Sequence, residues 1–198
     1  MIKENVTLKK CRVNDIYEIR KIASKAFPEA FSSIINQEQI SYMMDVMYGE
    51  KALTLDIESG DQNYFLMYDE GKPCGYISLT TPDRFIKERI ENCHKKNGSP
   101  ANMQVIRDYK KPVYLLHKIY LLPEKKGCGL GRLLLQYAEN IVSKLSKGEP
   151  SLMILQVNRK NFAVDFYKHL GMRIIGRQDF VLDHGFEMND FVMGIDIN

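Results

Sequence analysis

The stretch Lys126-Gly-Cys-Gly-Leu-Gly131 places three glycines at alternate positions, directly in front of an apolar helical pattern. Glycine loses more backbone freedom on folding than any other residue, so such a cluster is expected to serve a purpose. The first N–H groups of a helix have no partner within the helix, and the helix dipole places partial positive charge beside them. Because glycine has no Cβ, several of these groups can approach one anion. The stretch therefore predicts a phosphate-binding loop.

Two common phosphate-binding motifs do not fit this loop. The pattern G-x-x-x-x-G-K-[ST] is absent, and Gly127-Cys-Gly-Leu-Gly-Arg132 lacks the spacing of G-x-G-x-x-G. Lys125, Lys126 and Arg132 add positive charge around the glycines. On the loop alone, a plain strand-to-helix connection with permissive glycines stays open.

The segments on both sides of the loop indicate two central strands. A near-continuous apolar run over residues 113–122 is typical of a strand buried on both faces. An apolar helical stripe follows from Leu130 to Leu145, and residues 152–157 form a second apolar run. A strand–helix–strand crossover of this kind requires parallel strands.

The rest of the chain adds antiparallel strands and further helices. We predict a strand over 6–13, a helix from Asp15 that ends at Pro28, a helix from Asn36 to about Gly49, a hairpin of 63–68 and 74–80, a short helix from Ala163 that Gly171 closes, and a closing hairpin of 173–182 and 187–197. The polar segment 82–112 is expected to be a surface excursion. This order predicts an α+β fold, a mixed sheet with helices on both faces, in a single domain over residues 1–198.

Composition bounds the partners and the compartment. A net charge of +3 on 198 residues gives no argument for nucleic acid or a membrane surface as a partner. The four cysteines are scattered without zinc spacing, so we expect neither a metal site nor disulfides: Cys11, Cys74, Cys93 and Cys128. The N-terminus lacks the apolar centre of a secretory signal, and no stretch is long and apolar enough for a membrane span. We expect a cytoplasmic protein.

Taken together, these segments resemble the GNAT acetyltransferases. Lys126 to Gly131 resembles the family's [QR]-x-x-G-x-[GA] segment, with Lys in the first position, and His117-Lys-Ile-Tyr-Leu-Leu-Pro-Glu124 resembles the strand before it. The following V-N…A-x-x-F-Y-x-x-x-G-F block is matched by Val157-Asn158, Asn161-Phe-Ala-Val-Asp-Phe-Tyr167 and Leu170-Gly-Met172. The resemblance covers nearly the whole chain. It implies an acyltransferase that passes an acetyl group from acetyl-CoA to an amine, on a sheet whose central parallel strands splay apart.

The same resemblance implies which residues hold the cosubstrate. Asn158 would hydrogen-bond the amides of the pantetheine arm, which would enter between the two central strands. Asn161 either contacts coenzyme A or only caps the short helix, because it precedes Ala163 by two residues instead of three. The pyrophosphate would be bound by the backbone N–H groups of Lys126, Gly127, Cys128, Gly129, Leu130, Gly131 and Arg132. The pantetheine arm would pair with backbone groups of the preceding strand, which would also polarise the thioester carbonyl: Ile119, Tyr120 and Leu121.

Two side chains are candidates for acid–base chemistry. Tyr167 matches the family tyrosine, and a phenol of pKa about 10 can give a proton to a departing thiolate. The alternative is a tyrosine that only packs on an apolar stripe. His117 is a candidate general base because imidazole titrates near neutral pH. A hydrogen-bonded core histidine, with ordered water removing the proton, stays open.

The acceptor is less defined by sequence. A small primary amine such as a polyamine is our expectation, because the chain has no strong charge bias suited to a macromolecule. Alternatives are a protein lysine or N-terminus, or a coenzyme A-binding module without turnover. Met43, Met44 and Met47 would lie near one wall of the acceptor cleft, and acidic partners for an amine could be Glu29, Glu187 and Asp190. A homodimer stays open, as family members often dimerise.

Overall fold

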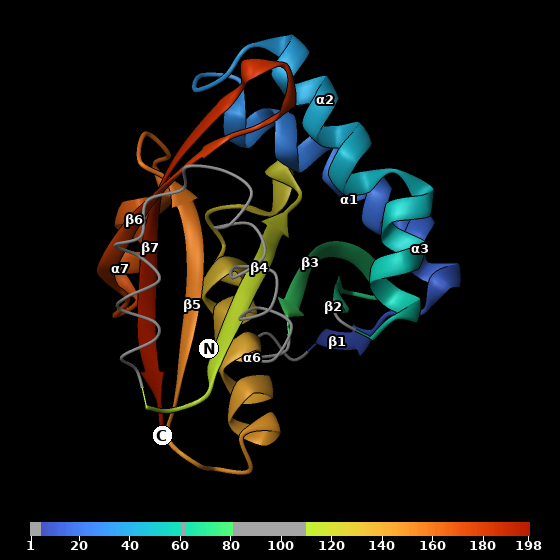
Figure 1. Ribbon diagram of the computed structural model, residues 1–198. Helices are drawn as coiled ribbons and strands as arrows, with labels where there is room; N and C mark the ends of the chain where they lie inside the picture. The colour runs from blue at the N-terminus through green and yellow to red at the C-terminus, as the bar shows by residue number, and fades with distance from the viewer. Residues whose placement is uncertain (1–4, 61, 81–109) are drawn as a thin grey trace. The chain divides into compact units, whose positions relative to one another are not determined.

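The computed structural model describes residues 5–60, 62–80 and 110–198, and Figure 1 shows their helices and strands. Within these ranges, seven strands form one mixed sheet in the order β1-β2-β3-β4-β5-β7-β6. The chain divides into two compact units. We call Met1–Leu79 with His117–Ala138 the N-terminal unit, and Thr80–Leu116 with Glu139–Asn198 the C-terminal unit. The α+β mixed sheet is thereby confirmed, whereas a single domain stays a prediction.

The strands of the N-terminal unit are β1 (Val6–Lys10), β2 (Gln62–Asp69), β3 (Lys72–Thr80) and the second half of β4 (Val113–Leu121). β1 runs antiparallel to β2. Glu70 and Gly71 join β2 to β3 with φ values of 53° and 75°. Two successive residues of positive φ match the twist of a tight hairpin, which confirms the predicted antiparallel pair.

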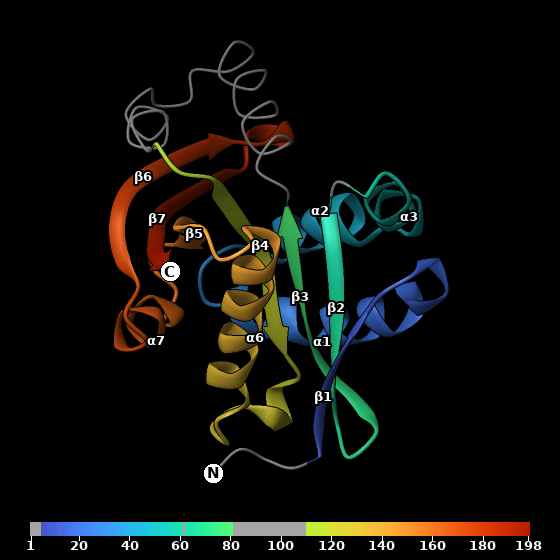
Figure 2. The same cartoon turned by 90° about the horizontal axis from the view of Figure 1, so that it is seen from below.

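Three helices complete this unit: α1 (Ile16–Phe31), α2 (Gln37–Tyr48) and α3 (Glu50–Glu58). Figure 2 shows α1 and α2 behind the strands and α6 in front of them, so helices lie on both faces of the sheet, as predicted. The cap of α2 is also confirmed, because Asn36 Oδ1 accepts from the Gln39 amide at 2.8 Å.

The prediction that Pro28 ends the first helix is wrong. α1 continues to Phe31, and the Ser32 amide donates to the Pro28 carbonyl at 2.8 Å. The rings of Phe27 and Phe31 stack with centroids 4.5 Å apart, and both side chains are buried. A proline inside a helix costs about 3 kcal/mol, because it removes a hydrogen bond and crowds the preceding turn. Burial of the two rings, at roughly 2 kcal/mol each, offsets this cost.

The sequence reading also missed α3. This helix buries only Leu53 among its apolar residues, so its stripe is too weak to stand out. Gly49 separates it from α2 by a tight turn, where a Cβ would lie 2.6 Å from the Asp45 carbonyl oxygen. A side chain at position 49 would therefore push the two helices apart.

The C-terminal unit contains β5 (Ser151–Asn158), α7 (Ala163–His169), β6 (Arg173–Val181) and β7 (Glu187–Ile197). The parallel register joins Val113–Leu115 of β4 to Leu152–Ile154 of β5, as predicted for the two strands around α6 (Leu130–Leu145). Beyond these pairs, the splaying of the strands stays a prediction. Gly171, at φ +92°, follows α7, and β6 and β7 form the expected long hairpin beside β5 (Figure 1).

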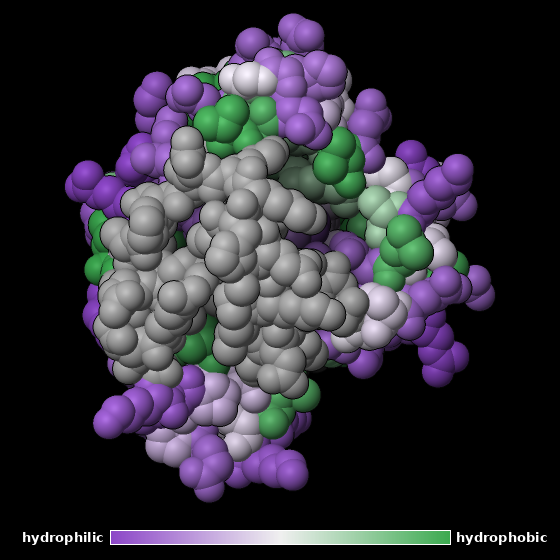
Figure 3. Space-filling model, in the orientation of Figure 1, coloured by the Kyte–Doolittle hydropathy of each residue, from purple (hydrophilic) through white to green (hydrophobic). Residues whose placement is uncertain are grey.

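Hydrophilic side chains cover much of the coloured surface in Figure 3. The described helices include none that is long and apolar enough to cross a membrane. Most of the predicted surface excursion, residues 82–109, lies outside the described residues, as does Cys93. Cys11 and Cys74 are buried free thiols, and Cys128 is an exposed one.

Candidate active site

The glycine loop in the N-terminal unit connects a short 3-10 helix, η2 (Pro123–Lys125), to the start of α6 at Leu130. Gly127 and Gly129 have φ values of +76° and +83°, a region that favours glycine. A Cβ built at either position would meet no atom within 4 Å. The backbone conformation therefore requires glycine, and the space beside the loop is open.

The amides of this loop are available to a ligand. Among the described residues, no acceptor faces the N–H groups of residues 127–132; the first such bond runs from Leu133 to the Gly129 carbonyl at 3.2 Å. Residues 126–129 are also exposed. Bare N–H groups at the positive end of a helix, here one of 16 residues, attract anions, so the geometry fits the predicted phosphate-binding loop.

Two of the three nearby cations have carboxylate partners. Lys125 Nζ lies 2.8 Å from Asp69 Oδ2, and this hydrogen bond raises the pKa of Lys125. Lys126 pairs with Glu29, so Glu29 has a role other than the acceptor binding considered from sequence. Arg132 forms no ion pair with a described residue. Attraction for an anion therefore comes mainly from the backbone and from Arg132.

The end of β4 holds the three residues expected to meet the pantetheine arm. Ile119 and Tyr120 are half-buried and Leu121 is buried. The Leu122 amide donates to the Cys74 carbonyl at 2.8 Å, and a Cβ at Gly75 would lie 2.7 Å from the Tyr120 oxygen. Glycine at position 75 thus permits β3 to approach the backbone of β4 closely at Tyr120.

His117 is exposed on β4, but its ring is held by hydrogen bonds. Its Nδ1 lies 2.8 Å from Gln62 Oε1, and the same oxygen accepts from the Ser78 hydroxyl at 2.7 Å. Lys118 Nζ lies 3.2 Å from the same Nδ1. The ring of His117 is therefore hydrogen-bonded, as expected for a histidine with a structural role. It is also exposed to solvent, as expected for a general base.

A cluster of tyrosines surrounds Lys118, whose side chain is buried. Lys118 Nζ lies 5.8 Å and 5.6 Å from the ring centroids of Tyr48 and Tyr64, and Tyr76 donates to the Tyr48 hydroxyl at 2.8 Å. Burial raises the pKa of these tyrosines well above the usual value. The sequence reading missed this cluster and Gln62. The alternation of Gln62 with Tyr64 and Leu66 was the available signal, because it puts an amide on the inward face of β2.

Asn158 and Asn161 lie at the end of β5 in the C-terminal unit, and both are buried. Asn158 Oδ1 accepts from the Lys160 amide at 3.0 Å, which leaves its NH₂ group as the donor toward a ligand. Asn161 Oδ1 accepts from the Ala163 amide at 2.9 Å. Asn161 thus bonds to the first amide of α7, whose N-cap position is held by Phe162 without a side-chain cap bond. The contact of Asn161 with coenzyme A stays a prediction.

Tyr167 lies on α7 in the same unit with 7% of its surface exposed. Its ring meets Phe166 edge to face at 5.4 Å. Burial raises the pKa of Tyr167 well above its usual value, so the phenol stays protonated at neutral pH. A protonated phenol suits a proton donor, and the same burial suits a packing role.

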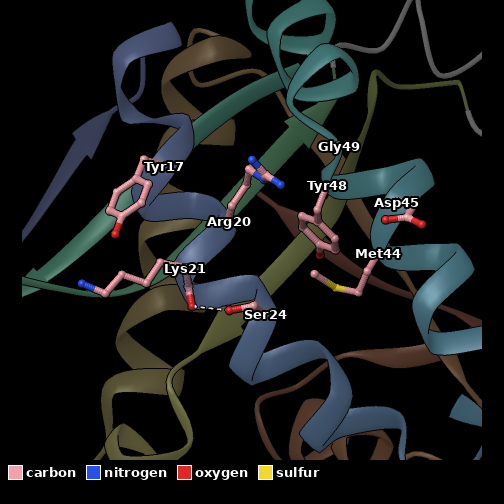
Figure 4. Close-up of a pocket in the computed structure, with 8 residues that line it drawn as sticks. All are labelled: Tyr17, Arg20, Lys21, Ser24, Met44, Asp45, Tyr48 and Gly49. Atoms are coloured by element: carbon pink, nitrogen blue, oxygen red, sulfur yellow. Dashed lines mark hydrogen bonds between the residues drawn. The ribbon is translucent and has the colours of Figure 1, made fainter.

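A hollow of about 370 Å³ in the N-terminal unit lies between α1 and α2 (Figure 4). Met44 lines it, whereas Met43 is buried in the core, so the methionines do not form one surface. Ser24 on this wall donates to the Lys21 carbonyl at 3.0 Å. In the part of the chain that the structure describes, no group of three or more His, Cys, Asp or Glu side chains is arranged for a metal ion.

Comparison with known proteins agrees with this architecture. A model of the Acetyltransferase (GNAT) family matches residues 16–172. A solved N-acetyltransferase (PaiA) from Thermoplasma acidophilum in complex with coenzyme A is 19% identical, with a TM-score of 0.64, and the match covers 96% of this chain and 97% of that one. No curated protein sequence matches significantly.

Two further solved structures share the fold. The ribosomal-protein-S18-alanine N-acetyltransferase from Escherichia coli is 17% identical, with a TM-score of 0.60, over 98% of this chain and 94% of that one. A spermidine N-acetyltransferase (SpeG) mutant from Vibrio cholerae is 17% identical, with a TM-score of 0.60, over 97% and 94%. The chain belongs to the GNAT family. It is an acetyl-CoA-dependent N-acetyltransferase.

Proposed function

We propose that this enzyme transfers the acetyl group of acetyl-CoA to a primary amine of a small molecule such as a polyamine. The observation that carries the acetyl-CoA part is the run of amides over residues 127–132 at the N-terminus of α6. These amides have no acceptor among the described residues, and residues 127–129 are exposed. Open space at Gly127 and Gly129 leaves room for a diphosphate. Backbone donors and the helix dipole supply the attraction without needing paired lysines.

The amides from Lys126 to Arg132 hold the pyrophosphate, and the backbone of Ile119, Tyr120 and Leu121 pairs with the pantetheine arm. Asn158 offers its NH₂ group to the arm, because its Oδ1 already accepts from Lys160. Asn161 supports the same turn by bonding to the first amide of α7, and it contacts the cosubstrate next to Asn158.

Two side chains handle protons. Acetyl-CoA supplies an activated acetyl group on a thioester, and an amine of pKa near 10 must lose a proton before it can attack. His117 takes that proton, because it is exposed and imidazole is the side chain most often used as a general base. Tyr167 holds a proton for the departing sulfur, and the burial that raises its pKa keeps that proton in place until it is needed.

The proposal of a small amine as acceptor rests on the net charge of the chain and on one buried carboxylate. The net charge of +3 offers no strong field for a macromolecular partner. Asp190 is buried and pairs in register with Asn158 of β5 and Gln178 of β6, which brings a carboxylate to the end of β5 where an ammonium group can meet it. A polyamine carries further ammonium groups that such a carboxylate would bind.

The experiment is an acceptor screen with purified enzyme. Acetyl-CoA consumption would be followed by release of the coenzyme A thiol across polyamines, amino acids, aminoglycosides and lysine or N-terminal peptides, with mass spectrometry of each product. We expect thiol release only with an amine, and a singly acetylated polyamine as the best product. Peptides acetylated faster than every small amine would overturn the acceptor class. Tight coenzyme A binding without turnover on any amine would instead identify a binding module.

A further inference from the structure

We propose that Glu29 of α1 competes with the cosubstrate for Lys126, so that Lys126 exchanges the Glu29 carboxylate for the diphosphate when acetyl-CoA binds. The inference rests on the proposed function, which brings a diphosphate to the loop amides. It adds a residue that limits the affinity for the cosubstrate and that lies outside the loop, on a helix. Both residues belong to the N-terminal unit.

The two lysines at the start of the loop have carboxylate partners of different burial. Lys125 Nζ lies 2.8 Å from Asp69 Oδ2, and only 8% of the Asp69 side chain is exposed. Lys126 pairs with Glu29, whose side chain is 42% exposed. Removing the cation from a buried carboxylate is costly, because water cannot take its place. An exposed ion pair contributes little and opens easily, so Lys126 is the lysine that a ligand can recruit.

Glu29 stands where its own helix disfavours a carboxylate. It lies in the last turn of α1, which ends at Phe31 and has no basic residue in that turn. The carbonyl end of a helix carries partial negative charge, so a carboxylate is repelled there. Lys126 offsets this repulsion in the free enzyme. A phosphate that reaches Lys126 meets the charge of Glu29 as well, and the end of the helix adds to the repulsion.

The loop keeps an anchor when Lys126 leaves Glu29. The neighbouring Lys125 stays bound to Asp69, which is the last residue of β2. Within the loop, the Cys128 thiol donates to the Lys125 carbonyl at 3.0 Å. Neither contact involves the side chain that moves. The loop amides therefore keep their arrangement while one side chain changes its partner.

The exchange sets the sign of the effect expected from removing Glu29. In the wild type, Lys126 gives up one anion to gain another, so the exchange adds little to the affinity for coenzyme A. Without the Glu29 charge, Lys126 attracts the diphosphate at no such cost, and the phosphates also lose a repelling neighbour. The affinity should therefore rise. A residue that only supported the loop would give the opposite sign when removed.

The test is a double-mutant cycle, measured by calorimetric titration with coenzyme A. We expect Glu29→Gln to bind coenzyme A about fivefold more tightly, and Lys126→Met to bind it about twofold more weakly. In the double variant most of the gain should disappear, because Glu29 acts through Lys126. The matched control is Glu50→Gln, which removes an exposed carboxylate that lies 3.9 Å from Arg20. Arg20 is about 13 Å along α1 from Glu29, beyond the screening length, so this control should leave the affinity unchanged.

Two further ligands assign the effect to the diphosphate. Dephospho-coenzyme A keeps the diphosphate and should show the same gain in Glu29→Gln, whereas pantetheine lacks it and should show none. An unchanged or lower affinity of Glu29→Gln for coenzyme A, or a gain that persists in full without Lys126, would overturn the proposal. So would the same gain with pantetheine, or a gain confined to coenzyme A, which would point to its ribose phosphate.

The failure of this inference can be told apart from the failure of the proposed function. If Gly129→Asp binds coenzyme A as tightly as the wild type, the loop is not the diphosphate site, and the proposed function fails there. If Gly129→Asp loses affinity but Glu29→Gln gains none, the loop holds the diphosphate and only the exchange by Lys126 is wrong.

Discussion

The two units contribute site residues in different ways. In the N-terminal unit, polar contacts fix the groups: Gln62 and Ser78 hold His117, Tyr76 bonds to Tyr48, and the glycine loop presents backbone amides. In the C-terminal unit, Tyr167 is held by apolar burial and by the ring of Phe166. Hydrogen bonds can select a tautomer or an anion, whereas burial can only favour the neutral form of a group.

This difference teaches which experiments are informative in each unit. A polar contact in the N-terminal unit is tested by changing the partner of a group, for example Gln62 beside His117. Burial in the C-terminal unit is tested by changing the group itself.

Tyr167→Phe should have the largest effect. The variant keeps the buried ring but removes the proton, so kcat should fall by about 10²-fold or more while CoA affinity stays the same. Tyr137→Phe is the matched control, since its hydroxyl donates to the Val6 carbonyl at 3.3 Å, outside the proposed site. Steady-state rates from about pH 6 to pH 10 check this. An unchanged kcat throughout would reduce Tyr167 to a packing residue.

Gly129→Asp should weaken coenzyme A binding by about 30-fold or more. The new carboxylate would occupy the open space beside the loop amides and repel the pyrophosphate. Gly129→Ala isolates the strain at φ +83°, and Gly148→Asp adds the same charge at another open glycine of φ +77°. Calorimetric titration measures the three affinities. Equal affinities in Gly129→Asp and Gly148→Asp would exclude the loop as the pyrophosphate site.

The effect that develops only above neutral pH is on stability, where both units should respond alike. Burial raises the pKa of Tyr48, Tyr64, Tyr76 and Tyr167 above the value of the unfolded chain. The unfolded state therefore loses these protons first as pH rises above about 10, and the stability that they contribute below that pH is lost.

The slope should approach about 1.4 kcal/mol per pH unit for each tyrosine that remains protonated in the native state. Denaturant unfolding between about pH 8 and pH 11 measures how the free energy of unfolding depends on pH. In Tyr167→Phe the slope should be shallower by the contribution of one tyrosine, about 1.4 kcal/mol per pH unit. A free energy of unfolding that stays level across this range would contradict burial of these phenols.

Sequence patterns predicted the elements whose signals are local. The apolar runs of β4 and β5, the stripe of α6, the Asn36 cap and the β6–β7 hairpin each follow from neighbouring residues, and the structure confirms them. The prediction that the first helix ends at Pro28 was wrong because only the cost of the proline is visible in the local sequence. The burial of Phe31, which offsets this cost, depends on the packed fold. α3 was missed because a helix that buries one apolar residue has little periodicity.

The glycine loop was predicted as an anion site, and its geometry fits that prediction because the signal lies in consecutive residues. The partners of His117 could not be predicted in the same way. Gln62 comes from β2, and Ser78, which bonds to the Gln62 oxygen, comes from β3. Only the register of the folded sheet brings them beside His117 of β4. The ion pair of Lys126 with Glu29 is equally non-local, so the sequence overstated the positive charge available to a ligand.

The claim that the loop amides bind the pyrophosphate is tested most directly by backbone amide NMR. The enzyme would be titrated with coenzyme A and, in parallel, with pantetheine, which lacks the diphosphate and the nucleotide. We predict that the amides of residues 127–132 shift with coenzyme A and become protected from hydrogen exchange, and that pantetheine leaves them unchanged. Loop amides that ignore coenzyme A, or that respond equally to pantetheine, would contradict the account.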